Sequence, residues 1–310
     1  MRDISRKFST LRTATAEATL IASPDTLACI RQGDAPKGDP LPVAKVAAIQ
    51  AAKDTSRIIP YCHPVGVEAV DVSFDLQEGA IITTVTVKAV HKTGVEMEAL
   101  TAASAAALTL YDMLKMIDES MEIIGVKLLE KRGGKSDFRN AYDRPLRAAV
   151  LVLSDTIAAG EKDDRSGKLI VERLEAEGFQ VSDYRIIPDD TGQIRETLIQ
   201  YADADNYDLV LTTGGTGFSH RDNTPEAMRE VIEREIPGIP EALRNYGQDR
   251  TPYAMLSRGK AGLRGDTIIV NLPGSSRGVA ESLDALFPGI MHAFGMLWGY
   301  SGHPETKERR

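Results

Sequence analysis

Two acidic residues, Glu96 and Glu98, begin a long run of apolar residues and alanines in the stretch KTGVEMEALTAAS. Carboxylates in the first turn of a helix stabilise it by about 0.3–1 kcal/mol each, because they face the positive end of the helix dipole. Carboxylates also serve as general acids and bases when their pKa values are shifted toward the working pH. The local pattern is compatible with both the structural and the catalytic role.

The same predicted helix carries a further acidic group, Asp112, in the stretch LYDMLK. Because successive helical residues turn by about 100°, Asp112 returns to nearly the face of Glu98, but a rise of about 1.5 Å per residue separates the two by about 21 Å. Lys115 follows Asp112 at a spacing that suits a surface ion pair or an acid–base pair. The two ends can act on one small substrate only if two copies of the chain share the site.

Three further residues of the first half are candidates for chemistry. Lys37 occurs in the loop APKGDP, where no helix or strand requires a lysine. His63 lies between Pro60 and Pro64, which restrict the backbone, although most isolated histidines are structural. Cys62 precedes His63 without any recognisable metal-ligand spacing, and we therefore expect no zinc site.

The second half contains the glycine-rich stretch TTGGTGFSHRDNTPEA. Its glycines, between Gly214 and Gly217, allow backbone N–H groups to approach a phosphate closely. The stretch is not a P-loop, because no Gly-Lys-Ser/Thr follows, and it lacks the GxGxxG of dinucleotide-binding folds. Taken alone, it is weak evidence for a binding site.

Acidic residues in neighbouring loops strengthen that evidence. They are Asp155, Asp189, Asp190 and Asp222. In a parallel sheet, ligands bind outside the carboxyl ends of the strands, so these loops are expected to converge. Carboxylates beside phosphates indicate Mg²⁺. Turn and cap formation explains Asp190 better than it explains Asp222.

These groups need elements that position them. In the first half, VDVSFDL alternates apolar and polar residues, QEG turns the chain and AIITTVTVKAV is β-branched, which predicts an antiparallel hairpin. We also expect a strand near 14–22, a helix capped by Ser23, a helix over 43–53, the long helix from about Val95 and a strand near 126–130. The order β-α-α-β-β-α-β predicts an α+β sandwich of the ferredoxin-like kind with one extra helix.

The second half follows RNAYDRPLR, residues 139–147, which have no periodicity and contain the predicted domain boundary. We assign one domain to 1–140 and another to 146–310. The runs AAVLVLSDT, DLVLTTGGTG and TIIVNLPGSS do not alternate, which predicts strands covered on both faces. Helices lie between them, the first two with Ser166 and Thr191 as expected caps. The pattern predicts a doubly wound, mostly parallel α/β sheet.

Composition narrows the class of protein. The chain has 310 residues, of which 42% are apolar and 26% charged, with a net charge of −8. An acidic balance argues against nonspecific nucleic-acid binding, and no apolar run approaches the roughly 18 residues of a membrane span. The start, MRDISRKFSTLRT, lacks a signal peptide, and Cys29 and Cys62 are too few for a disulfide framework. We expect a cytoplasmic protein with reduced thiols.

The motifs KGD, IPYCHP, KTGVEMEALTAAS, LYDMLK and GGKS resemble, in order and spacing, the cyclic pyranopterin monophosphate synthase (MoaC) family of molybdenum-cofactor biosynthesis. The resemblance covers residues 1 to about 138. It implies a ferredoxin-like fold and a homo-oligomer, a hexamer assembled from dimers, with the site at the dimer interface. The implied activity is that of a lyase that converts a cyclised dihydro-GTP intermediate into cyclic pyranopterin monophosphate and releases pyrophosphate. No cofactor is firmly implied for this domain.

The same resemblance implies roles for individual residues. Asp112 is the expected catalytic residue, and Lys37, Lys115 and Glu96 complete the catalytic set; which lysine is the general acid stays open. The substrate is expected to contact Tyr61, Cys62, His63, Met97, Glu98 and Lys131. The chain departs from the usual family pattern in GGKSDF and in AVHKTG, which contains His91.

The pattern SD…PD…TTGGTG…RD-x-TPEA…SR…LPG resembles the molybdopterin-binding MoaB/MogA family, over about residues 146–305. The resemblance implies adenylylation of molybdopterin with ATP and Mg²⁺, and Asp189 and Asp222 match the catalytic, metal-binding aspartates. The expected binding residues are Ser154, Asp155, Gly214, Gly215, Thr216, Gly217, Pro273 and Gly274. This family tends to form trimers, which are compatible in symmetry with a hexamer.

The preferred interpretation is therefore a bifunctional enzyme of molybdenum-cofactor biosynthesis. In the alternative, the second domain only binds molybdopterin or holds the oligomer together. The stretch SDT…DDRSG favours this alternative, because it is more similar to the MoaB branch, in which some members lack clear activity. HRDNTPEA keeps the aspartate that an active enzyme needs. A nucleotide-binding scaffold without catalysis is the third interpretation, and the Asp112/Lys115 pair argues against it.

Overall fold

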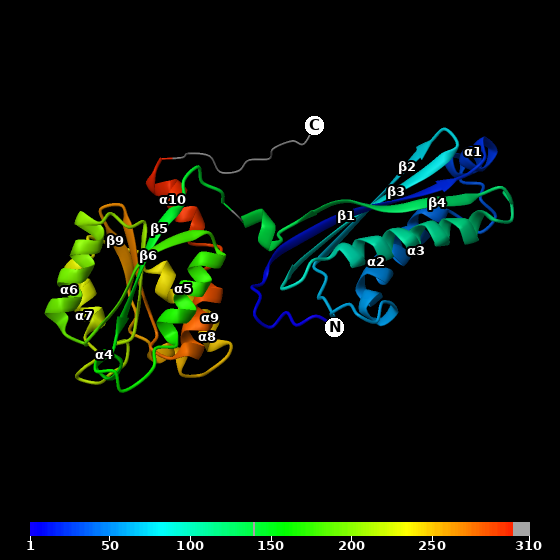
Figure 1. Ribbon diagram of the computed structural model, residues 1–310. Helices are drawn as coiled ribbons and strands as arrows, with labels where there is room; N and C mark the ends of the chain where they lie inside the picture. Colours follow the sequence, from blue (N-terminus) through cyan, green and yellow to red (C-terminus); the bar gives the residue numbers. More distant parts are fainter. Residues whose placement is uncertain (139, 300–310) are drawn as a thin grey trace. The chain divides into compact units, whose positions relative to one another are not determined.

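The computed structural model describes residues 1–138 and 140–299. The chain forms two compact units, Met1–Phe138 and Arg139–Arg310 (Figure 1). Leu146 and Arg147, which end the predicted boundary segment, already belong to the first strand of the second unit. Within the two described ranges, no helix combines the length and the apolar character that a membrane crossing requires.

The first unit has its elements in the order that the sequence predicts. They are β1 (Thr10–Ile21), α1 (Pro24–Gln32), α2 (Pro40–Ile58), β2 (Ala69–Gln77), β3 (Ala80–His91), α3 (Glu96–Leu114) and β4 (Glu122–Arg132), followed by a 3-10 turn over Lys135–Phe138. The strands form an antiparallel sheet in the order β2-β3-β1-β4. Ser23 caps α1 as predicted, whereas α2 is longer than predicted because Asp39 caps it and Pro40 begins it.

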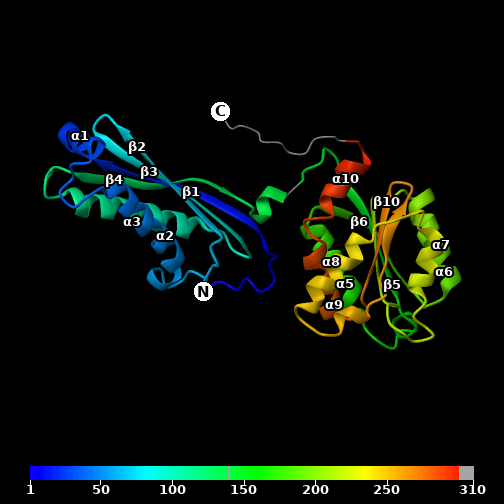
Figure 2. The same ribbon diagram turned by 180° about the vertical axis from the view of Figure 1, so that it is seen from behind.

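The core of the first unit is built from small side chains. Ala14, Ala16 and Ala18 alternate along β1 and are buried, and alanines of α2 and α3 join the same core. Small residues allow helices to pack closely, and α2 and α3 lie along the same side of the sheet (Figures 1 and 2). The middle of α3 is therefore committed to packing, and its charged groups, Glu96, Glu98 and Asp112, lie at its two ends.

The second unit alternates strands and helices. Its strands are β5 (Leu146–Leu153), β6 (Phe179–Ile187), β7 (Leu209–Thr213), β8 (Arg234–Glu235), β9 (Ala261–Arg264) and β10 (Thr267–Leu272). Its helices are α4 (Asp155–Ala158), α5 (Ser166–Ala176), α6 (Thr191–Ile199) with a π turn over Gln200–Ala204, α7 (Thr224–Val231), α8 (Gly238–Gln248), α9 (Ser276–Leu286) and α10 (Met291–Leu297), with a 3-10 turn over Ala254–Leu256.

The sheet of the second unit has the order β6-β5-β7-β10-β9-β8. The first four strands are parallel, and β9 and β8 add an antiparallel edge that the sequence pattern did not predict. Helices α6 and α7 cover one face, and α5, α8 and α9 cover the other (Figure 1). Alternate residues of β5 enter opposite cores, Val150 on one side and Leu151 on the other. Burial on both faces explains why the strand is apolar without alternation.

Two predicted helix caps are wrong. Ser166 is the first residue inside α5, and its hydroxyl donates to the carbonyl of Gly274 at 2.9 Å. Asp164 accepts instead from the N–H groups of Ser166 and Gly167, at 3.0 and 2.9 Å. Thr191 likewise begins α6, while Asp190 is its cap and accepts from the N–H of Gln193 at 2.8 Å. In both cases a nearby aspartate satisfies the free N–H groups of the first turn.

Candidate functional site

The far end of α3 carries an ion cluster centred on Asp112. Lys115 Nζ lies 2.7 Å from Asp112 Oδ1, and Lys37 Nζ lies 2.9 Å from Oδ2. Lys37 also donates to the main-chain oxygen of Asp112 at 2.8 Å. The hydrogen bonds from Lys115 and then Lys37 lower the pKa of Asp112 to about 2, so it stays ionised at neutral pH. The structure brings these three predicted residues together on an accessible surface.

The near end of α3 holds the other predicted acids. Glu98 is only 3% exposed, and burial raises its pKa, with a further rise from the charge of Glu96. Glu96 Oε1 lies 3.1 Å from Lys131 Nζ. Burial and the charge of Glu98 together raise the pKa of the Cys62 thiol, which places Cys62 in the same neighbourhood. A carboxyl that tends to hold its proton thus lies beside one that is ion-paired.

Surface residues complete this near-end cluster. Tyr61 is 78% exposed and Met97 is 38% exposed, so both are accessible to a ligand. His63 lies close enough to His91 to lower the pKa of His91. The predicted residues Tyr61, Cys62, His63, Glu96, Met97, Glu98 and Lys131 therefore gather at one end of α3.

Arg12 also belongs to the near-end cluster, although it was absent from the predicted site. Its Nε donates to the main-chain oxygen of His91 at 3.1 Å. Burial lowers the pKa of Arg12, while the charges of Glu96 and Asp137 raise it. The sequence held a signal for this residue. Arg12 occupies the position in β1 that continues the buried alternation of Ala14 and Ala16, where a packing role would require a small apolar side chain.

Within one chain, the two ends of α3 lie far apart. Glu98 and Asp112 lie in one continuous helix, Glu96–Leu114. At about 1.5 Å per residue their separation along the axis is about 21 Å. Each copy of the chain therefore carries the near-end cluster and the Asp112 cluster as two separate groups of residues.

Predicted residues of the second unit gather at the carboxyl ends of its parallel strands. Asp155 follows β5, and its Oδ1 accepts from the main-chain N–H of Asp189, which follows β6, at 3.1 Å. Arg221 Nη1 lies 3.1 Å from Asp155 Oδ2. Burial raises the pKa of Asp189, and the charges of Asp155 and Asp222 raise it further. Asp189 Oδ1 is buried and has no hydrogen-bond partner among the described residues.

The glycine loop after β7 packs tightly against these aspartates. Gly214 has φ of 110°, and a Cβ there would lie 2.2 Å from the carbonyl oxygen of Leu153. Gly215 has φ of 61°, and a Cβ would lie 2.1 Å from Thr224 Oγ1 and 3.4 Å from Asp189 Oδ1. Only glycine suits these conformations and this close approach. The loop therefore brings its backbone next to the buried oxygen of Asp189.

Arg258 stabilises this loop and was also missing from the predicted set. Its Nε donates to the carbonyl of Gly217 at 2.7 Å, and its Nη2 donates to the carbonyl of Asp222. Its Nη1 lies 2.6 Å from Glu226 Oε1 on α7. A single planar guanidinium thus ties the loop, the aspartate and the following helix together.

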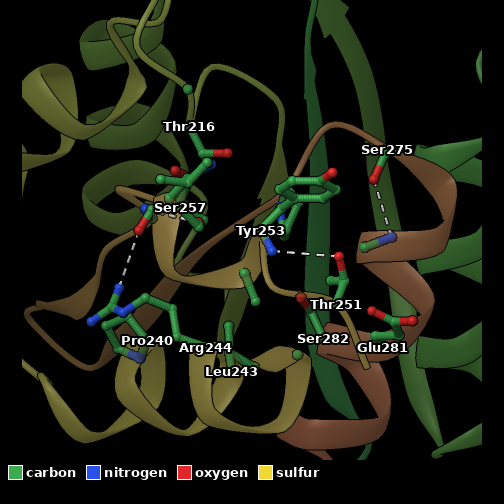
Figure 3. Close-up of a pocket in the computed structure, with 18 residues that line it drawn as sticks. Thr216, Pro240, Leu243, Arg244, Thr251, Tyr253, Ser257, Ser275, Glu281 and Ser282 are labelled. Carbon is green, nitrogen blue, oxygen red and sulfur yellow. Dashed lines mark hydrogen bonds between the residues drawn. The ribbon is translucent and has the colours of Figure 1, made fainter. Parts of the chain in front are cut away.

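A cavity of about 330 Å³ adjoins the loop. Of the predicted binding residues, Thr216, Gly217 and Pro273 line it. Figure 3 shows Arg244 and Ser257 on one side of the cavity and Ser275 on the other. The three aspartates 155, 189 and 222 are not among its lining residues, so the cavity and the carboxylates are neighbours that share the glycine loop.

Three predicted binding residues have structural contacts. Ser154 caps α4 by accepting from the N–H of Ile157 at 3.4 Å. The carbonyls of Pro273 and Gly274 accept from Thr213 and Ser166, at 2.6 and 2.9 Å. Asp190, as its cap role indicates, points to α6 rather than to the loop.

The carboxylates beside the glycine loop suit a magnesium ion that has few protein ligands better than one that the protein encloses. Residues 1–138 and 140–299 contain no group of three or more His, Cys, Asp or Glu side chains suited to a metal. Magnesium that arrives with a nucleotide needs only one or two carboxylates, because phosphates and waters supply the rest. The partnerless oxygen of Asp189, with Asp222 nearby, meets that requirement.

Comparisons with known proteins cover both units. The MoaC family model matches residues 1–134, and the model of the probable molybdopterin binding domain matches residues 149–292. A protein of Chlorobaculum tepidum named molybdenum cofactor biosynthesis bifunctional protein is 42% identical over 303 residues, which cover 98% of this chain and 96% of that protein. A Synechococcus elongatus protein of the same name is 40% identical over 96% of this chain and 98% of its own length.

Proteins similar to single units were also found. The cyclic pyranopterin monophosphate synthase of Pelobacter propionicus is 51% identical over 138 residues, which cover 44% of this chain and 86% of that protein. The solved structure of the molybdopterin biosynthesis enzyme MoaB from Thermus thermophilus is 45% identical, with coverage of 50% of this chain and 97% of that one and a TM-score of 0.48.

Proposed function

The chain belongs to the bifunctional molybdenum cofactor biosynthesis proteins, a MoaC-family unit followed by a probable molybdopterin binding unit, and from this membership we propose two activities. The first unit converts a cyclised dihydro-GTP intermediate into cyclic pyranopterin monophosphate and releases pyrophosphate. The similarity to a protein named cyclic pyranopterin monophosphate synthase, 51% identical, supports this assignment. The second unit binds molybdopterin and adenylylates it with Mg-ATP.

The main support for the first activity is that charged groups lie in two separate clusters, one at each end of α3. Closing a cyclic phosphate breaks the bond from the α-phosphorus to pyrophosphate, and cations such as Lys37 and Lys115 stabilise the leaving group. Rearranging the ring requires an acid and a base of different pKa. The buried Glu98, whose pKa is raised, and the ionised Asp112 differ in that way.

A complete first site then requires two copies of the chain. The near end of one α3, with Glu98, lies beside the far end of a partner's α3, with Asp112, in a dimer that builds into a hexamer. Closed two-fold symmetry makes two identical sites in each dimer. Pyrophosphate release from the cyclised intermediate by the full chain tests the activity. If the chain binds the intermediate and releases no pyrophosphate, the lyase assignment is wrong.

The observation that carries the second activity is the partnerless oxygen of Asp189 beside the glycine loop. In this proposal the loop N–H groups bind the phosphates of ATP, and the adjoining cavity takes the pterin, because Thr216 and Gly217 belong to both. Asp189 and Asp222 hold the magnesium ion, which neutralises phosphate charge during the transfer. Arg258 keeps Asp222 in place.

A second candidate is that this unit only binds molybdopterin or maintains the oligomer. ATP-dependent adenylylation of molybdopterin by the full chain distinguishes the two. We expect activity in the unsubstituted chain and its loss in Asp222→Ala. Tight molybdopterin binding without any adenylylated product would favour the binding module.

A further inference from the structure

His91 is the last residue of β3, and its side chain lies on the helix-facing side of the sheet. Val87 and Ala89 of the same strand are buried there, and residues two apart along a strand point to the same face. The main-chain N–H of Thr93 donates to His91 Nδ1 at 3.4 Å. A ring nitrogen that accepts carries no proton, so the neutral ring bears its hydrogen on Nε2.

Basic groups from several segments lie near this ring or share its face of the sheet. Arg12 of β1 pairs in register with Ala89 and reaches the main chain of His91. Burial lowers the pKa of His91, and the charges of His63, Lys92 and Arg12 lower it further, so the ring is neutral at pH 7. Lys131 of β4 pairs with Ala14 and therefore occupies the same face.

Acidic groups are also present, but burial raises the pKa of Glu98, which disfavours its charge, and the other two are engaged. Glu96 pairs with Lys131, and Asp137 accepts from the main-chain N–H of Gly133 at 2.7 Å. The near end of α3 therefore offers cations from β1 and β4, and Lys92 directly after β3, together with one neutral donor, His91. Such a set favours a polyanion, and a neutral donor adds a directional hydrogen bond without adding repulsion among the cations.

We propose that His91 is a substrate-binding residue whose Nε2–H donates to a phosphate oxygen of the nucleotide-derived substrate, beside Arg12 and Lys131. The inference rests on the proposed lyase function and names the part of the substrate that the near end of α3 binds. His91 contributes to affinity for the phosphate chain and takes no part in the bond changes themselves.

Two substitutions of His91 test the roles of its two ring nitrogens separately. His91→Asn keeps an acceptor near Nδ1 for Thr93 but removes the donor at Nε2, whereas His91→Gln extends an amide donor to about the position of Nε2. Binding of inorganic triphosphate to the full chain is measured by titration calorimetry without magnesium, which the proposed nucleotide site of the second unit requires. We expect His91→Asn to weaken binding about tenfold and His91→Gln to stay within about twofold of the unsubstituted chain.

A matched control is available on the opposite face of β4. Lys127 pairs with Glu17 at 2.9 Å, in register with an outward-facing residue, so Lys127→Gln removes a charge from the same strand without touching the cluster. It should leave triphosphate binding unchanged. In turnover, His91→Asn should raise KM for the cyclised intermediate and leave kcat nearly unchanged.

Three results would overturn the proposal. They are equal binding by His91→Asn and the unsubstituted chain, equal weakening by His91→Gln and His91→Asn, and no triphosphate binding by the unsubstituted chain. Because calorimetry needs no turnover, a chain that releases no pyrophosphate would refute the lyase assignment without obscuring this measurement.

Discussion

The two units solve the problem of assembling charged groups in different ways. In the second unit, Asp155, Asp189 and the glycine loop follow the parallel strands β5, β6 and β7, and parallel strands deliver the residues after them to one edge. In the first unit, an antiparallel sheet supports one 19-residue helix with acidic groups at both ends. A parallel sheet thus gathers its candidate site within one chain, whereas the first unit has two separate clusters, which the proposed function joins through a second copy.

The largest expected effect tests the shared site directly. Glu98→Gln and Asp112→Ala should each lower pyrophosphate release at least about 10²-fold, because each removes a group of the proposed acid–base set. Coexpressing or reassembling the two variants in equal amounts should restore about a quarter of the activity, because half of the dimers are mixed and each mixed dimer has one intact site.

The control for this experiment is each variant reassembled with itself, which should stay inactive. Equal oligomer size in all samples, measured by light scattering, shows that assembly is unaffected. If the mixed sample stays as inactive as its components, the two ends of α3 do not share a substrate, and the contrast between the units disappears.

The second unit should behave in the opposite way. Asp189→Asn and Asp222→Asn should each lower adenylylation about 10²-fold, because each removes charge that holds the magnesium nucleotide. Mixing these two variants should restore nothing, because both residues belong to one chain's site. Asp189→Asn should not lower stability, because burial already disfavours its charged form. Recovery of activity on mixing would mean that the second site is shared as well.

The fold followed from the sequence where periodicity was strong. The hairpin of β2 and β3, the helix from Glu96 and the apolar strands β5, β7 and β10 were all predicted, because burial on one or both faces imposes a pattern on consecutive residues. Strand β8 has two residues at the sheet edge and β9 beside it has four, which is too short for a period to show. Ser166 and Thr191 were predicted as caps in place of Asp164 and Asp190 because several polar residues compete at each helix start, although cap formation had been weighed for Asp190.

The sites were predictable only in part. Asp112, Lys115 and Lys37 were singled out from local motifs, and the structure joins them. Arg12 and Arg258 were not, because their contacts reach residues far along the chain, such as His91 from Arg12 and Gly217 from Arg258. Both arginines nevertheless had a local signature, because Arg12 interrupts a buried alternation and Arg258 stands in the SR of the family pattern.

The prediction of intermediate size concerns a residue of the first unit that supports the fold and takes no part in the proposed chemistry. Asp118, six residues beyond the exposed Asp112, is 6% exposed and accepts from Ser23, Thr26 and Ser120. Replacing it by Asn should lower the free energy of unfolding by about 2–3 kcal/mol, because hydrogen bonds to a buried charge are lost. The only tryptophan, Trp298, lies in the second unit, so circular dichroism should record the loss and tryptophan fluorescence should not.

The effect of Asp118 should also depend on pH in one direction. Burial raises the pKa of Asp118, but its hydrogen-bond donors outweigh burial and hold the pKa below the ordinary value of 3.8. A depressed carboxyl pKa stabilises the fold fully above the ordinary value and loses that contribution as the pH falls below it. The stability difference between the unsubstituted chain and Asp118→Asn should therefore shrink below about pH 4. A difference that grows on acidification would contradict the assignment.

The smallest effect distinguishes two adjacent aspartates of the second unit. Asp190 caps α6 through the N–H of Gln193, whereas Asp189 turns a partnerless oxygen toward the glycine loop. Asp190→Ala should lower the free energy of unfolding by about 1 kcal/mol, because one N–H of the first turn loses its acceptor. Adenylylation should remain unchanged, while Asp189→Asn should show the reverse: intact stability, followed by tryptophan fluorescence, and lost activity. If Asp190→Ala also abolished adenylylation at full folding, the magnesium nucleotide would have to lie nearer to α6, and the site would no longer centre on the loop after β7.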